Sequence, residues 1–292
     1  MTARRLPEVN EPRVTSILSG LPRRPPSGRP GDPGRFAPGG VARRVNAETR
    51  LLLGGPRALL LQLVHPMVAA GVADHSDFLT DPFRRLWNTL DLTLTIGFGD
   101  RDRASAAVDR VAATHAAVRG ERDDRHYRAG DPELLAWVHA TLVDTAIETY
   151  VRFVGRLGMG ARERYLHEMD DQARAFGVPR DILWPSYDDF RRYVEETVAS
   201  LRVLDEGRSL GRAVLDPRTP ASLRPVVGIL RFVSAGLMPA SLREPFGLRW
   251  SPADERGLGM LAACVRGGGA MLPDPLRRWP HAREADERLH AA

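Results

Sequence analysis

The sequence predicts an all-α protein, with a single multi-helix domain that follows a disordered basic arm. Apolar residues make up 43% and charged residues 27% of the 292 residues, a balance typical of globular proteins. From about Val45 onward the apolar side chains recur with helical spacing. We find no run of alternating β-branched residues bounded by hairpin turns, so nothing in the sequence predicts a sheet.

The arm comprises residues 1–44, and the helical domain comprises residues 45–292. The first 40 residues hold eight prolines and six glycines but few large apolar side chains, a composition that cannot form a packed core. Residues 1–45 contain nine arginines and three acids, whereas the rest contains 33 arginines and 34 acids. A nucleic-acid-binding domain would have a clear basic excess, so the neutral body predicts no nucleic-acid partner.

Several functional classes are excluded by composition. All 42 basic residues are arginine, so no Schiff-base lysine and no phosphate-binding P-loop lysine can exist. Cys264 is the single cysteine and cannot form an intrachain disulfide. No secretory signal precedes the body, and no stretch of about 20 largely uncharged apolar residues could span a membrane. We therefore expect a soluble cytoplasmic protein without a membrane span.

Four helix starts stand out in the body. Asp81-Pro82 and Asp131-Pro132 each combine an N-cap residue with proline at the first helical position. The first of these helices should end at Gly97, and the second should run to about Leu157. Ser186 with Asp189 resembles a capping box, and Ser251-Pro252 with Asp254 opens the last helix. The last helix should stop at the glycines 267–269.

His115 lies on the apolar face of a predicted helix that ends at Gly120. Alanines surround it, so a large flat group has room to lie against the helix. Arg119 follows one turn later, where it could reach an anionic group. The competing interpretation is a core histidine bonded to a backbone carbonyl, which is the commoner case for one buried imidazole. The face comprises Val108, Val111, Ala112, His115 and Val118.

His139 repeats this pattern on the helix that starts at Pro132, where it aligns with Leu135 and Leu142. His65 precedes Pro66 at a predicted helix end or kink. The remaining histidines have polar neighbours. We expect His126, His167, His281 and His290 to be solvated, and His75 to lie in a turn.

Arg85, Asn88 and Thr89 share one face of the helix that starts at Pro82, together with Leu92. Arg85 and Thr89 are neighbours at i and i+4. Polar side chains on a helix that is otherwise apolar need a polar partner. Either Arg85 pairs with a carboxylate such as Asp91, Asp144 or Glu148, or Arg85 and Thr89 line a pocket for oxygen or an anionic cofactor edge.

A set of ordered sequence blocks resembles the family that joins rubber oxygenase (latex clearing protein) with the oxygenase of the mycophenolic-acid pathway. The resemblance runs from about Val45 to Pro275. The blocks are LLLGGPRALLLQLVHPMVAAGVADHSDF, DPFRRLWNTL, THAAVRG, YRAGDPELLAWVHATLVDT and LMPASLREPFGLRWS.

The resemblance implies an all-α domain that binds heme b and oxidises its substrate with dioxygen. Rubber oxygenase has an Arg-x-x-Lys-Thr pattern on its distal helix, which here corresponds to Arg85, Asn88 and Thr89. Asn88 replaces the lysine, so an amine-capped iron is not available, and rubber-like substrates become doubtful. The order of the helices places the proximal histidine at His115, with Arg119 and His139 as further candidate cofactor contacts.

The function predicted from the sequence is therefore a heme-dependent oxygenase with catalytic Arg85 and Thr89 and an iron ligand at His115. Its substrate would be an apolar or unsaturated small molecule that undergoes C=C cleavage, hydroxylation or desaturation, with an electron donor where the reaction needs one. The alternative is a non-catalytic helical carrier or sensor that binds heme or a lipid. A third hypothesis is an interaction protein whose basic arm binds nucleic acid or an anionic membrane.

Overall fold

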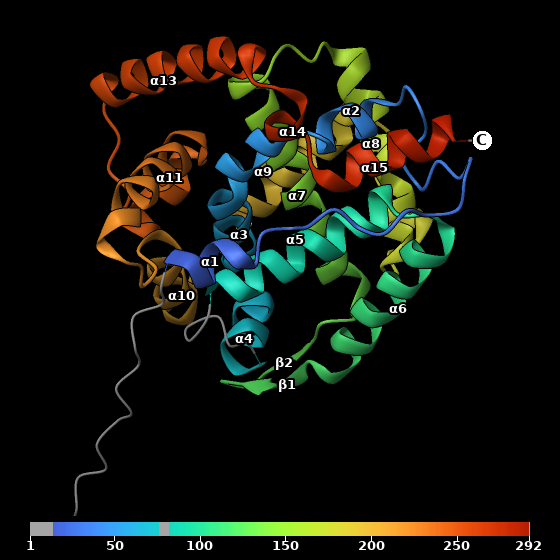
Figure 1. The fold of residues 1–292 in the computed structure, drawn as a ribbon. Coiled ribbons are helices and arrows are strands. Elements are labelled where there is room, and N and C mark those ends of the chain that lie inside the picture. Colours follow the sequence, from blue (N-terminus) through green and yellow to red (C-terminus); the bar gives the residue numbers. More distant parts are fainter. Residues whose placement is uncertain (1–13, 76–81, 292) are drawn as a thin grey trace, which may run out of the picture.

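The computed structural model describes residues 14–75 and 82–291, and in these residues nearly all of the regular secondary structure is helical (Figure 1). The α-helices are α1 (Val14–Ser19), α2 (Val41–Asn46), α3 (Gly55–Val64), α4 (Pro66–His75), α5 (Pro82–Phe98), α6 (Arg101–Ala117), α7 (Pro132–Phe153), α8 (Met159–Ala175), α9 (Tyr187–Ser200), α10 (Asp205–Leu215), α11 (Arg224–Leu237), α12 (Ala240–Arg243), α13 (Pro252–Met271), α14 (Asp274–Arg277) and α15 (Pro280–His290). Short 3₁₀ turns are η1 (Thr49–Gly54), η3 (Arg180–Ile182), η4 (Ala221–Leu223) and η5 (Glu244–Phe246). The all-α prediction is confirmed.

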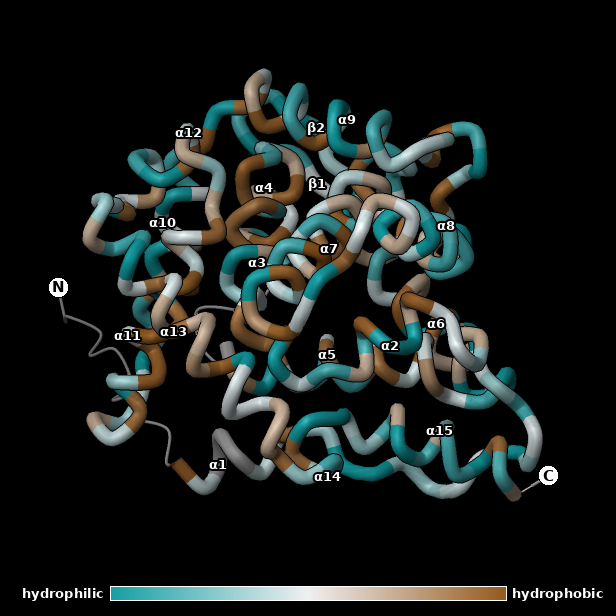
Figure 2. The backbone as a smooth tube through the Cα atoms, turned by 90° about the horizontal axis from the view of Figure 1, so that it is seen from above, coloured by the Kyte–Doolittle hydropathy of each residue, from teal (hydrophilic) through white to brown (hydrophobic). Residues whose placement is uncertain are grey.

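Helix α7 forms the centre of the domain, and η1, α2, α3, α8, α9 and α13 pack around it. Trp137, Val143 and Ile147 of α7 are at most 1% exposed. In Figure 2 the apolar residues concentrate on inner helices such as α3 and α4, whereas α8 and α15 are largely hydrophilic. The core is therefore built around one long apolar helix, as the sequence 132–153 suggests.

The helix starts lie where the sequence places them. Ser186 accepts a hydrogen bond from the backbone N–H of Asp189 at 3.1 Å. Ser251 and Asp254 form a reciprocal capping box. The predicted end of the last helix is wrong, because α13 continues through Gly267, Gly268 and Gly269 to Met271. Asp81, the predicted cap of α5, lies outside the described residues.

A two-stranded hairpin, β1 (Arg119–Arg122) and β2 (Arg125–Arg128), interrupts the helices and was not predicted. The two turn residues, Asp123 and Asp124, have φ values of 49° and 60°. Positive φ at both central positions defines a tight hairpin turn, and aspartate tolerates this conformation better than most residues. Helix α6 consequently ends at Ala117, before the expected Gly120.

Residues 20–44, predicted to belong to the flexible arm, lie along the body and are held by specific contacts. Phe36 is 4% exposed and packs edge-on against Phe98, with ring centroids 5.1 Å apart. Arg43 binds Asp286 at 2.6 Å. The composition gave no sign of this packing because the partners of these residues lie far away in the sequence. The first 13 residues of the arm lie outside the described residues.

No single helix among the described residues is long and apolar enough to cross a membrane. The segments Thr49–Val64 and Pro66–His75 reach that length only together, across a bend of 107°.

Candidate active site

Helices α5 and α6 form an antiparallel pair, joined by Gly99 and Asp100. Both helices have 17 residues. Arg85 lies 13 residues before the end of α5, and His115 lies 14 residues after the start of α6. At 1.5 Å per residue, both are about 20 Å from the connection and so at the same level of the pair. The helices spread apart from the connection in Figure 1, with α4 and the hairpin near the open end.

His115 is half-buried in the last turn of α6, and its side chain makes no hydrogen bond with any residue in the described part of the chain. Burial lowers its pKa below the ordinary value of 6.5, so the imidazole is neutral at pH 7. The predicted apolar face is only partly covered, because Val111 is half-buried while Ala112 and Ala116 are exposed. A neutral imidazole with an available lone pair is suited to binding a metal.

The polar residues of α5 have different exposures. Arg85 is half-buried, whereas Asn88 and Thr89 are exposed. Two of the carboxylates considered as partners of Arg85 have other partners: Asp144 binds Arg57 at 2.6 Å and Arg191 at 2.7 Å, and Glu148 lies 3.9 Å from Arg191.

Arg119 begins β1, and the strand register places Arg128 of β2 directly opposite it. Both are exposed, and neither forms an ion pair with a described residue. Arg122 and Arg125 also face each other, but Arg122 binds Asp74, and Arg125 binds Glu206 at 2.8 Å. Only the outer pair, next to the end of α6, therefore has uncompensated charge. Sequence reasoning missed Arg128. A hairpin turn predicted at Asp123-Asp124 from the sequence would have placed Arg128 opposite Arg119.

Helix α4 supports the hairpin at the open end of the pair. The Tyr127 hydroxyl donates to Asp74 at 2.7 Å and lies 3.1 Å from Nε2 of His75. Burial, with the hydrogen bond to the Asp74 carboxylate, raises the pKa of Tyr127 to about 12. Val118 packs beside Gly71, where a Cβ atom would be in contact with it. These contacts tie the end of α6, and with it His115, to α4.

His139 is in a different environment. It is 4% exposed, its ring is parallel to Trp184 with centroids 6.4 Å apart, and its Nε2 has no hydrogen-bond partner in the described structure. Burial lowers its pKa to about 4, so it stays neutral. His65, the third candidate, is half-buried at the bend before α4, and its Nδ1 accepts from the N–H of Met67 at 3.3 Å. The structure thus packs α5 against α6 and leaves His139 in the core beside Trp184.

Arg57 and Asp144 form a buried ion pair that the sequence analysis did not predict, since it named Asp144 only as a possible partner of Arg85. These side chains are 3% and 1% exposed, and Arg57 also donates to the carbonyl of Leu237 at 2.8 Å and to the Thr145 hydroxyl. The pair connects α3, α7 and α11. Its full hydrogen bonding indicates a structural role in holding the core helices.

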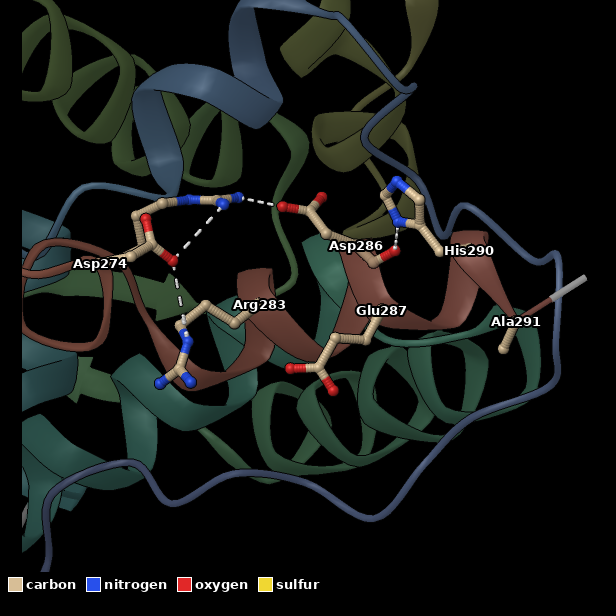
Figure 3. Close-up of a pocket in the computed structure, with 7 residues that line it drawn as sticks. Asp274, Arg283, Asp286, Glu287, His290 and Ala291 are labelled. Carbon is tan, nitrogen blue, oxygen red and sulfur yellow. Dashed lines mark hydrogen bonds and ion pairs between the residues drawn. The ribbon is translucent and has the colours of Figure 1, made fainter.

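A hollow of about 560 Å³ lies at the C-terminal end and contains none of the predicted site residues (Figure 3). Its acidic and basic side chains are largely engaged with one another: Arg278 binds Asp286, and Arg283 lies 3.8 Å from Asp274. It is a salt-bridged surface around α14 and α15, in which the charges compensate each other.

His281 corrects one expectation, since it was assigned to a solvated tail but is 2% exposed. Its Nε2 lies 3.3 Å from Asp91 of α5. His126 and His167 are exposed, as predicted.

Comparison with known proteins identifies the family. The family described as "ER-bound oxygenase mpaB/B'/Rubber oxygenase, catalytic domain" matches residues 42–267, well over half of the chain. No curated protein and no solved structure is significantly similar. The matched region contains α5, α6 and the hairpin, so the candidate site lies within an oxygenase catalytic domain, whose co-substrate is dioxygen. The chain belongs to the family of ER-bound oxygenase mpaB/B' and rubber oxygenase catalytic domains.

Proposed function

We propose that this protein is a heme b-dependent oxygenase acting on an apolar or unsaturated small molecule, with His115 as the iron ligand. The observation that carries the proposal is the imidazole of His115. It is neutral, half-buried, without a hydrogen-bond partner in the described structure, and bordered by exposed alanines at the open end of the α5–α6 pair. This donor fits heme, which needs one neutral imidazole and an apolar surface. When bound, the heme supplies the oxidative chemistry with dioxygen.

The arginines at the start and end of the hairpin are suited to the heme propionates. Like charges directly opposite each other across two strands are destabilising. Arg119 and Arg128 occupy such a position without a compensating carboxylate among the described residues. An anionic carboxylate bound between them would remove this repulsion and accept charge-assisted hydrogen bonds. Arg128 thereby joins Arg119 as a proposed contact of the anionic edge of the cofactor.

On the opposite helix, Arg85 and Thr89 are the proposed catalytic residues. The guanidinium of Arg85 is a fixed positive charge at the level of His115, and it would stabilise negative charge on a substrate or oxygen held there. The Thr89 hydroxyl can donate a hydrogen bond to the same group. Asn88, an exposed amide between them, is a weak iron ligand and would not compete with dioxygen for a bound heme.

We further propose that the reaction is C=C cleavage, hydroxylation or desaturation, with an electron donor where the reaction needs one. We also propose a cytoplasmic location. The second candidate function is a non-catalytic heme or lipid carrier. The buried Nε2 of His139 has no hydrogen-bond partner among the described residues and favours this function, because a bis-histidine iron would suit electron transfer or sensing.

The absorption spectrum and iron content of the purified full-length protein test the cofactor. We expect a Soret band and one iron per chain. Reduction followed by oxygen-uptake measurements with apolar alkenes then separates an oxygenase from a carrier, since only the oxygenase consumes oxygen in a substrate-dependent manner. A protein that binds no heme when supplied with it contradicts the proposal.

A further inference from the structure

The second half of α6 has little packing of its own. Ala104 and Ala107 are buried in the first half of the helix, whereas no residue from Val108 to Ala117 is buried. The contacts that usually hold a helix in place are therefore few at the end that carries His115, the proposed iron ligand. The position of this end depends on the residues that follow it.

The chain continues from α6 directly into the hairpin, and backbone hydrogen bonds join the two. The N–H of Val118, the residue that caps α6, donates to the carbonyl of His115 at 3.1 Å. The N–H of Ala129 donates in turn to the carbonyl of Val118 at 2.9 Å, which closes the hairpin at the capping residue. A displacement of the hairpin would therefore also move His115, three residues before Val118.

The hairpin is held on the body by one of its two faces. In the strand register Tyr127 lies opposite Gly120, and opposed residues point to the same face. The Tyr127 hydroxyl donates to the carboxylate of Asp74 on α4 at 2.7 Å. Arg125, on the same face, binds Glu206 of α10 at 2.8 Å. The hairpin thus has one anchor on each of two helices of the body.

Tyr127 is the anchor nearer to α6, and it is closely packed. It is 5% exposed, and a Cβ atom at Gly71 of α4 would be 3.6 Å from its ring. A Cβ atom at Gly120 would be only 2.5 Å from the hydroxyl oxygen, so the hydroxyl has room because residue 120 is glycine. Asp74 has Arg122 as a second partner, so loss of the hydroxyl would not leave this carboxylate unpaired.

We propose that Tyr127 is a positioning residue for the active site, and that its hydrogen bond to Asp74 fixes the last turn of α6 and with it His115. The bond holds the hairpin against α4, and the hairpin holds a helix end that has few core contacts. A hydrogen bond to a charged acceptor is stronger than one between neutral groups, so one hydroxyl can order this turn. The inference rests on the proposed function for the role of His115, whereas the ordering of α6 does not depend on heme.

Hydrogen–deuterium exchange of the full-length protein without added heme tests the positioning. Tyr127→Phe keeps the ring but loses the bond to Asp74, and the amides of residues 111–118 should then exchange about tenfold faster. Asp74→Ala should have at least this effect, because it also releases Arg122. Asp74→Asn keeps an oxygen acceptor for the hydroxyl and should retain most of the protection. The double variant Tyr127→Phe/Asp74→Ala should exchange no faster than Asp74→Ala, since both changes remove the same bond.

Tyr165→Phe is the matched control, because it also removes the hydroxyl of a buried tyrosine. The Tyr165 hydroxyl donates to Asn46 at 3.3 Å and joins α8 to α2. This variant should leave the exchange of residues 111–118 unchanged. Unchanged exchange in Tyr127→Phe, or equal acceleration in Tyr165→Phe, would overturn the proposal. If Tyr127→Phe does not fold by far-UV circular dichroism, the comparison of Asp74→Ala with Asp74→Asn decides the same question.

The rate of heme transfer to excess apomyoglobin is measured in parallel. If His115 is the iron ligand, Tyr127→Phe should lose heme about tenfold faster than the unmodified protein, and Tyr165→Phe should not. Faster exchange in Tyr127→Phe with an unchanged rate of heme loss would overturn the role of Tyr127 in positioning the ligand. A protein that binds no heme but shows the faster exchange refutes the proposed cofactor and supports the ordering of α6 by Tyr127.

Discussion

Arg288 of α15 donates a hydrogen bond to the carbonyl oxygen of Phe98, at 2.7 Å. The last helix thereby holds the end of α5, at the connection from which the two helices of the candidate site spread. The same guanidinium binds the carbonyl of Asp32 at 2.7 Å and the carboxylate of Glu284. One buried arginine therefore joins the C-terminal helix, the N-terminal segment and the α5–α6 pair.

Replacing Arg288 with methionine should destabilise the fold by about 3–5 kcal/mol, because Glu284 would remain as a buried charge without its partner. Denaturant unfolding measures the loss. Arg208→Met, which breaks the exposed pair with Asp205, should cost less than about 1 kcal/mol. Equal losses of unfolding free energy in the two variants would show that the buried Arg288–Glu284 pair stabilises the fold no more than the exposed Arg208–Asp205 pair does.

Phe36→Ala should lower the free energy of unfolding by about 3 kcal/mol, although Phe36 belongs to a segment that its composition marks as flexible. The ring is 4% exposed, and the substitution leaves a cavity beside Phe98. Leu21→Ala, at a residue that is 38% exposed, is the control and should change little. If Phe36→Ala also leaves the stability unchanged, this segment contributes nothing to the fold.

His115→Ala should abolish heme binding while the protein stays folded, because His115 is half-buried and bonds to no described side chain. The Soret absorbance per chain and the far-UV circular dichroism report the two properties. His126→Ala, whose side chain is 83% exposed, is the matched control and should keep its heme. Heme lost from His139→Ala and kept by His115→Ala would move the iron ligand to His139, and if both variants keep it, His65 becomes the candidate.

Asn88 should allow external ligands to reach ferric iron quickly. An amide coordinates iron weakly, whereas a neutral amine competes for the sixth position. Stopped-flow mixing with cyanide should therefore give faster binding in the unmodified protein than in Asn88→Lys. Asn88→Gln keeps an amide and should behave like the unmodified protein. A bis-histidine low-spin signal in electron paramagnetic resonance at rest would contradict an open distal side.

His139 should make stability depend on pH. Burial lowers its pKa from 6.5 to about 4, so between these values the unfolded chain binds more protons than the folded protein. Stability is then fully present above about pH 6.5 and is lost as the pH falls toward 4, by about 3 kcal/mol in total. Urea unfolding between pH 7.5 and 4.5 should show a shallower dependence for His139→Gln. If the free energy of unfolding changed equally with pH in the unmodified protein and in His139→Gln, the pH dependence would not come from His139.

Local signals predicted the helix starts well, because capping involves residues only three positions apart. Ser251 and Asp254, for example, form their capping box whatever surrounds them. The end of the same helix could not be predicted. Glycines 267–269 are poor helix formers, yet α13 continues through them. A Cβ atom at Gly269 would overlap the guanidinium of Arg50, so packing with a distant residue favours glycine inside the helix.

The sequence by itself determined the all-α class, the family resemblance and the candidates His115, Arg85, Asn88 and Thr89, since periodicity, capping and ordered motifs are properties of the chain. Only the tertiary structure decided the surroundings of these residues. It packed residues 20–44 on the body, buried His281 in the core, and placed Arg128 opposite Arg119. The physical reason is that burial and charge compensation depend on partners far away in the sequence, which local patterns do not encode.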